Sequence, residues 1–85
     1  MKVRVRFFAG LREALGCEAE DLELPLGTTT VGALLESLRQ RGAPWSEVLA
    51  EGRPIRAAVN QDMAVPRTAL HTGDEVAFFP PVTGG

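Results

Sequence analysis

The chain has 85 residues, 45% of them hydrophobic and 24% charged, which is the composition of one small globular domain. A core of this size leaves no room for an enclosed substrate cavity of ordinary enzyme size with its supporting shell. The net charge of −2 argues against a nucleic-acid-binding surface, and no apolar run approaches the roughly 20 residues that a membrane helix needs.

The first predicted element is a strand over residues 2–8, where charged and apolar residues alternate at the two-residue period of an extended chain. The residues expected to face inward are Val3, Val5 and Phe7. Because this start has no apolar signal core, we expect a cytoplasmic protein.

A short helix is predicted over residues 9–15, with Gly16 placed to end it. A second strand is predicted over residues 20–24, where acidic residues alternate with leucines. The acidic outer face of this strand would complement the basic outer face of the first strand if the two strands pair. Pro25 and Gly27 then break the pattern.

The strongest helix signal begins after three threonines, whose hydroxyl groups favour the N-cap position. Apolar residues then recur at the spacing of an amphipathic helix, at Val31, Leu34, Leu35 and Leu38. Arg39 and Arg41 are expected in the last turn, with Gly42 as the residue that ends the helix. A shorter helix is predicted over residues 44–50, burying Trp45, Val48 and Leu49.

The rest of the chain predicts short strands. One covers residues 56–60, with Ala57 and Val59 on one side, and a minor one covers residues 63–65. The last covers residues 75–79, after a turn at Gly73-Asp74, with Val76 and Phe78 inward. This order of elements predicts an α+β domain with one main helix across a mixed sheet.

The side chains offer no catalytic or metal-binding constellation. One cysteine, Cys17, and one histidine, His71, are too few for a disulfide, an iron–sulfur cluster, a zinc site or a nucleophilic Cys/His set. We interpret Cys17 as a small, partly buried residue and His71 as a solvated loop residue. Asp74 and Glu75 are adjacent, so on a strand they would point to opposite faces rather than form a carboxylate pair.

The C-terminal tail is the remaining candidate, and it reads Pro80-Pro81-Val82-Thr83-Gly84-Gly85. The two prolines stiffen the chain toward an extended polyproline conformation, and the two glycines fit a channel as narrow as a bare backbone. Residues 80–85, when extended, reach about 20 Å from the domain. We therefore predict a domain over residues 1–79 and a stalk that threads the carboxylate of Gly85 into a partner's active site. The alternative is an ordinary frayed terminus.

The free carboxylate restricts the chemistry of such a tail. An ionised α-carboxylate, with a pKa of about 3.5, is a poor electrophile at neutral pH. It needs activation, for example as an acyl-adenylate that a separate enzyme makes from ATP, before the acyl group passes to a sulfur or nitrogen nucleophile. The chain would then be a carrier without a bound cofactor, and its partners would supply the catalysis.

Three stretches of sequence resemble a known family. They are residues 73–85, with the motif Phe78-Phe79-Pro80-Pro81-Val82-Thr83-Gly84-Gly85, supported by Val3-Arg4-Val5-Arg6-Phe7-Phe8-Ala9 and by Ala57-Ala58-Val59-Asn60-Gln61. In these residues the chain resembles the MoaD-like family of ubiquitin-like sulfur carriers, the small subunits of molybdopterin synthase. The resemblance extends over essentially the whole chain.

The resemblance implies a ubiquitin-like β-grasp fold and a specific role for Gly85. An adenylyltransferase similar to ubiquitin-activating enzymes would adenylylate Gly85 with ATP, and a sulfur-donating enzyme would convert it to a thiocarboxylate. The tail would then deliver sulfur to cyclic pyranopterin monophosphate in the active site of the large synthase subunit, building the dithiolene of molybdopterin. The complex would be a heterotetramer, in which this chain is not itself the catalytic subunit.

A β-grasp fold also implies a docking patch. Its first and last strands lie side by side and parallel, which would bring Phe8 and Phe79 to the end of the sheet where the tail leaves. Phe8, Ala77 and Phe79 would then form an outward apolar surface for a partner. The alternative is that a loop or the first short helix covers one of the two rings.

Three other functions stay open at this point. The first is a sulfur carrier for thiazole synthesis or tRNA thiolation, although the Phe-Phe-Pro-Pro-Val-Thr sequence before the glycines favours molybdopterin. The second is a protein modifier joined to other proteins through Gly85, whose lysine-linked chains would have to use Lys2, the only lysine, or the N-terminus. An interaction module without carrier function would tolerate loss of the last two glycines.

Overall fold

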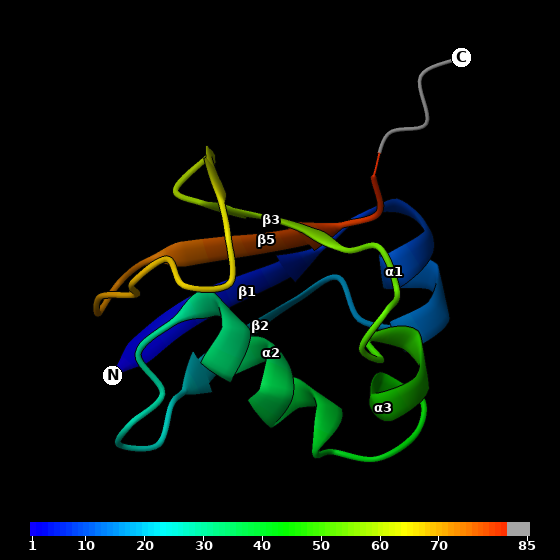
Figure 1. Cartoon of the computed structure of the whole chain (residues 1–85), viewed down its shortest axis with the longest axis horizontal. Helices are drawn as coiled ribbons and strands as arrows, with labels where there is room; N and C mark the ends of the chain where they lie inside the picture. The colour runs from blue at the N-terminus through cyan, green and yellow to red at the C-terminus, as the bar shows by residue number, and fades with distance from the viewer. Residues whose placement is uncertain (82–85) are drawn as a thin grey trace.

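Five strands form one mixed sheet in the computed structural model, which describes residues 1–81. The strand order is β2-β1-β5-β3-β4, in which β1 and β5 are parallel and the other neighbours are antiparallel. The strands are β1 (Lys2–Phe7), β2 (Ala19–Glu23), β3 (Arg56–Val59), β4 (Asp62–Ala64) and β5 (Glu75–Phe79), and the helices are α1 (Ala9–Leu15), α2 (Val31–Arg39) and α3 (Trp45–Val48). Figure 1 shows α2 and α3 below the sheet and α1 at the end of the sheet where β5 finishes.

The predicted alternation in the first and last strands is confirmed. Val3, Val5 and Phe7 of β1 and Val76 and Phe78 of β5 are all buried, because they face the helices. The predicted charge match between β1 and β2 is also confirmed, since Arg4 lies opposite Asp21 and its Nη1 is 3.0 Å from Oδ1 of that residue. Such exposed pairs contribute little energy, but here they agree with the strand register.

The main helix begins where the threonines predict. Thr30 is the N-cap of α2, and its hydroxyl oxygen accepts a hydrogen bond of 3.1 Å from the backbone N–H of Ala33. The apolar stripe of α2 is buried against the sheet, with Val31, Leu34 and Leu38 almost inaccessible to solvent. Together with the inward residues of β1 and β5, this stripe forms the single core cluster.

The end of α2 differs from the prediction. Arg39 is the last helical residue and Gln40 is the C-cap, so Arg41 lies outside the last turn and Gly42 lies two residues beyond the cap. The guanidinium of Arg41 instead forms a two-pronged pair with the carboxylate of Glu20 on β2, at 3.0 and 2.6 Å. This contact joins the segment after α2 to β2.

Helix α3 is shorter than predicted. It covers Trp45–Val48 rather than residues 44–50, because Leu49 leaves helical geometry at φ −102° and ψ 16°. The side chain of Leu49 is nevertheless fully buried, while Trp45 and Val48 are partly buried against the core. The carbonyl of Leu49 accepts a hydrogen bond from Nε of Arg39, so a side chain of α2 satisfies the end of α3.

A two-residue turn joins β3 to β4. Asn60 and Gln61 both have positive φ angles, 49° and 72°, the geometry of the tight hairpin whose twist matches that of the paired strands. The amide of Asn60 is held from outside the hairpin: its nitrogen donates to Oδ1 of Asp74 and its oxygen accepts from the N–H of Glu75, both at 3.0 Å. Because Asn60 and Gln61 form the turn, β3 ends at Val59 rather than at residue 60, and β4 covers Asp62–Ala64 rather than residues 63–65.

The strands present a second face opposite the one that packs on α2, and we call it the open face. Its residues follow from the register: Arg4 and Arg6 of β1, Glu75, Ala77 and Phe79 of β5, Arg56 and Ala58 of β3, and Met63 of β4. No helix within residues 1–81 is long and apolar enough to cross a membrane.

Candidate functional site

The site begins where β1 and β5 end together. Phe7 lies opposite Phe78 in the parallel register, and the N–H of Phe8 donates a hydrogen bond of 3.1 Å to the carbonyl of Phe78. The chain then turns into α1 at Phe8, whereas β5 continues into Pro80 and Pro81. These two half-buried prolines are the tail root, and Figure 1 shows it rising beside α1.

The parallel pairing implied for the first and last strands is confirmed, and it brings the predicted patch residues together. Phe8, Ala77 and Phe79 all lie at the end of the open face next to the tail root. Phe8 is 39% exposed, and Ala77 and Phe79 are half-buried. We call these three residues the docking patch. Helix α1 starts directly after Phe8, and Phe8 remains among the exposed large hydrophobic residues.

The open face extends this apolar surface beyond the residues predicted from the sequence. Ala58 pairs with Ala77 on one side and with Met63 on the other, and Met63 is 63% exposed. Ala58 is buried yet lies outside the core cluster, because its neighbours on the open face screen it from solvent. Alternation within β3 would have identified Ala58 and Arg56 once the pairing of β3 with β5 was known.

Two arginines flank the docking patch. The guanidinium of Arg6 lies 5.3 Å from the centre of the Phe8 ring, in cation–π range, and its Nη1 is 3.9 Å from Oε1 of Glu75. Arg56 lies directly opposite Phe79 in the register and is exposed. The patch is therefore an apolar centre with positive charge at two of its edges, a combination common in protein interfaces.

The other candidate side chains form no reaction centre. Cys17 is half-buried, with Sγ 3.8 Å from the carbonyl oxygen of Ala19, whereas His71 is exposed in the loop before β5. Asp74 is used in turn structure, since Oδ2 accepts a hydrogen bond of 2.7 Å from the N–H of His71. Within residues 1–81, no three His, Cys, Asp or Glu side chains come together in a way that could hold a metal ion.

The tail residues with the predicted chemistry lie outside the described residues. They are Val82, Thr83, Gly84 and Gly85. Of the predicted threading segment, the described structure contains Pro80 and Pro81. The predicted role of Gly85 therefore stays a prediction, and so do the roles of the docking patch and the tail root.

Comparison with known proteins identifies close relatives over the full length of the chain. The sequence profile of the ThiS family matches residues 5–85. The molybdopterin synthase sulfur carrier subunit of Haemophilus influenzae is 42% identical over 83 residues, which cover 98% of this chain and 99% of that protein.

Two solved structures have the same fold. A molybdopterin converting factor subunit 1 from Pyrococcus furiosus is 32% identical, with a TM-score of 0.78 and coverage of 96% of this chain and 99% of that one. A chain in a complex of subunits 1 and 2 of the molybdopterin-converting factor from Helicobacter pylori is 29% identical, with a TM-score of 0.65 and full coverage of both chains. The predicted ubiquitin-like β-grasp fold is confirmed.

Proposed function

Since the chain belongs to the ThiS family, we propose that it is the sulfur-carrier small subunit of a molybdopterin synthase. The observation that carries this proposal is the 42% identity, over almost the entire length of both chains, to a molybdopterin synthase sulfur carrier subunit. The motif that leads from β5 into the terminal Gly84-Gly85 supports it, because a carrier needs a narrow, reactive terminus.

The proposed chemistry takes place at the carboxylate of Gly85. One carboxylate oxygen attacks the α-phosphorus of ATP, which releases pyrophosphate and leaves a glycyl adenylate. A sulfur-donating enzyme supplies the sulfur that displaces AMP and leaves a thiocarboxylate. The activating enzyme consumes the ATP, and the carrier itself has no bound cofactor in this proposal.

The thiocarboxylate then transfers its sulfur in the active site of the large synthase subunit. The thiocarboxylate sulfur bonds to cyclic pyranopterin monophosphate, and water then cleaves the acyl–sulfur bond, which returns Gly85 to a carboxylate. Two such transfers from loaded carriers supply the two sulfur atoms of the dithiolene. The carrier contributes position rather than acid–base chemistry: its docking patch binds the large subunit, and the tail root directs the last residues into that subunit. A related subunit 1 forms a complex with its subunit 2, which supports this arrangement.

We propose a complex of two carriers and two large subunits in the cytoplasm. Each carrier would dock through Phe8, Ala77 and Phe79, whose rings and methyl group lie beside the tail root. The flanking charges of Arg6 and Arg56 would meet carboxylates on the large subunit, and these would steer the encounter.

Intact mass measurement tests the carrier chemistry. The full chain is incubated with ATP, its adenylyltransferase, and a sulfur source, and we expect a mass increase equal to the replacement of one oxygen by sulfur. A variant lacking Gly85 is the matched control and should show no increase. Exchange of labelled pyrophosphate into ATP in the presence of the chain shows that the adenylyltransferase is active. If the enzyme is active and the mass of the full chain still does not change, the proposal is contradicted.

The loaded carrier is then mixed with the large subunit and cyclic pyranopterin monophosphate. Formation of the dithiolene identifies the molybdopterin pathway. A loaded carrier that supports only thiazole synthesis or tRNA thiolation would assign it to another sulfur pathway, and attachment of the chain to lysines of other proteins would identify a modifier.

A further inference from the structure

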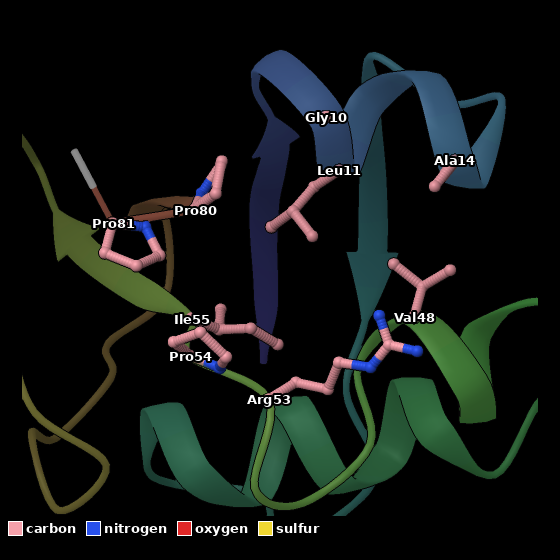
Figure 2. Close-up of a pocket in the computed structure, with 9 residues that line it drawn as sticks. All are labelled: Gly10, Leu11, Ala14, Val48, Arg53, Pro54, Ile55, Pro80 and Pro81. Carbon is pink, nitrogen blue, oxygen red and sulfur yellow. The ribbon is translucent and has the colours of Figure 1, made fainter. Parts of the chain in front are cut away.

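A hollow of about 400 Å³ lies beside the tail root. Figure 2 shows α1 above it, the end of α3 and the loop before β3 below it, and the tail root forming one wall. Leu11, Val48, Ile55, Pro80 and Pro81 give it an apolar lining, and Arg53 is the charged residue among the lining residues.

Helix α1 leaves this hollow open. A Cβ atom added at Gly10 would meet nothing within 4 Å, and Gly10 lies in regular helix without a positive φ angle. A larger side chain at this position would therefore project into open space rather than into the core. The walls of the hollow are α1, the end of α3, the loop before β3 and the tail root.

The charge of Arg53 indicates what the hollow would bind. Its side chain extends along the hollow toward Val48, as Figure 2 shows. It forms no ion pair with a carboxylate within residues 1–81. Guanidinium groups bind carboxylates through paired hydrogen bonds. The hollow therefore fits an apolar side chain next to an acidic residue.

The tail root links the hollow to a partner that binds the tail. Because Pro80 and Pro81 form a wall of the hollow, whatever occupies it touches the start of the tail. A partner that encloses the tail from Gly85 back to the domain must pass this point.

We propose that the hollow receives a segment of the large synthase subunit, with an apolar side chain in the hollow and a neighbouring carboxylate on Arg53. This inference rests on the proposed function. The contact anchors the tail root from a surface separate from the docking patch, and so it sets the direction in which the tail leaves the domain.

Filling the hollow tests the apolar half of the proposal. In Gly10→Leu the new side chain occupies the space that the partner would use, and leucine favours a helix more than glycine does. We expect the dissociation constant for the large subunit to rise at least about tenfold by calorimetric titration. Glu13→Leu, on the same helix but outside the hollow, is the matched control and should change it by less than about twofold.

Charge reversal tests the other half. Arg53→Glu should also weaken binding at least about tenfold, whereas Arg67→Glu, an exposed arginine outside the hollow, should change it by less than about twofold. A melting curve for each variant shows that it is folded. If Gly10→Leu does not melt cooperatively, Ala14→Leu on the same wall replaces it.

The outcomes separate this inference from the proposed function. Normal affinity in both hollow variants overturns the inference, while normal loading of sulfur onto Gly85 leaves the proposed function standing. Weaker binding by Gly10→Leu alone supports the apolar contact and overturns the carboxylate contact. Slower loading with unchanged affinity for the large subunit would assign the hollow to the activating enzyme and overturn the partner proposed. A wild-type chain that fails to bind the large subunit overturns both.

Discussion

Phe79 joins the core strand to the tail. Its neighbour Phe78 is fully buried and stacks on Phe7 with ring centres 6.1 Å apart, whereas Phe79 itself lies on the open face, half-buried and opposite Arg56. Burying a phenylalanine against a partner contributes on the order of 1.5–3 kcal/mol. Two adjacent phenylalanines thus have different roles: the ring of Phe78 stabilises the fold, and the ring of Phe79 is available for binding.

We expect Phe79→Asp to weaken binding to the large subunit by at least about 2 kcal/mol, some thirtyfold. The variant loses the apolar contact, and its carboxylate must also lose water at the interface. Calorimetric titration measures the affinity, and a melting curve measures the stability of the isolated domain, which should fall much less.

Leu26→Asp is the matched control for this variant, because Leu26 is a fully exposed apolar residue in a loop away from the open face. Equal affinities of Phe79→Asp and wild type would remove Phe79 from the docking patch. A large fall in melting temperature would mean that the ring supports the core.

Cys17 provides a second test at the residue scale. Its thiol is half-buried and its Sγ contacts the carbonyl oxygen of Ala19 and a carboxylate oxygen of Glu20, at 3.8 and 4.0 Å. Because the proposed sulfur sits on the terminal carbonyl of Gly85, we expect Cys17→Ser to keep substantial carrier activity. The measurement is thiocarboxylate formation by intact mass. A folded variant that cannot be loaded would show that the proposal assigns the sulfur to the wrong residue.

At the scale of elements, a contact between distant segments joins β2 to the connection between α2 and α3. The guanidinium of Arg41 pairs with Glu20 and also lies 4.6 Å from the centre of the Trp45 ring. Trp45 in turn packs edge-on against Phe7, with ring centres 5.4 Å apart. Hydrogen bonding from Arg41 lowers the pKa of Glu20 below its ordinary value of 4.5, although partial burial acts in the opposite direction.

This lowered pKa predicts a pH-dependent contribution to stability. A carboxylate with a depressed folded-state pKa stabilises the fold above its unfolded pKa, and that stability is lost as the pH falls through the folded pKa. Glu20→Gln should therefore lower the melting temperature at pH 7. Both side chains are about one-third exposed, so we expect an effect of about 1 kcal/mol or less.

Melting curves between neutral and acidic pH provide the measurement. The difference between Glu20→Gln and wild type should shrink as the pH falls below the ordinary carboxylate range. Glu13→Gln, whose carboxylate forms no ion pair within the described part of the chain, is the control and should show little difference at any pH. A constant difference across the range would mean that charge does not carry the contribution of Glu20.

At the scale of the whole molecule, the core and the proposed chemistry are in separate parts of the chain. The buried cluster extends from Val3 to Phe78 and combines one sheet face with the three helices. The proposed reactive group is the carboxylate of Gly85. This separation lets a stable domain present a terminus whose sequence is free to match a partner's channel.

Deleting Gly84-Gly85 should therefore abolish sulfur transfer and leave the melting temperature nearly unchanged. Replacing both glycines with alanines provides a less severe variant, in which the added Cβ atoms should obstruct a channel shaped for bare backbone. Thermal melting and the coupled synthase assay are measured on the same samples. A large loss of stability on deletion would show that the tail supports the fold, and retained transfer would contradict the carrier proposal.

Local patterns predicted the features that depend on neighbouring residues. Alternation identified the inward faces of β1 and β5, and the threonines before Val31 identified the cap of α2. These features follow from backbone geometry, since side chains alternate along a strand and a hydroxyl satisfies the first free N–H groups of a helix. The tail prediction likewise came from residue chemistry at adjacent positions, and the parallel pairing of the first and last strands came from the family resemblance.

The remaining features depend on contacts between segments far apart in the sequence. Arg41 lies beyond the helix and pairs with Glu20 on β2, and Asn60 adopts a positive φ angle in a turn where Asp74 and Glu75 hold its amide. The extension of the open face to Met63 and the hollow beside Pro80 exist only after β3, α1 and the tail root are brought together. A sequence pattern indicates only the local conformational preference of its residues. The long-range contacts that can override this preference form only when the whole core packs.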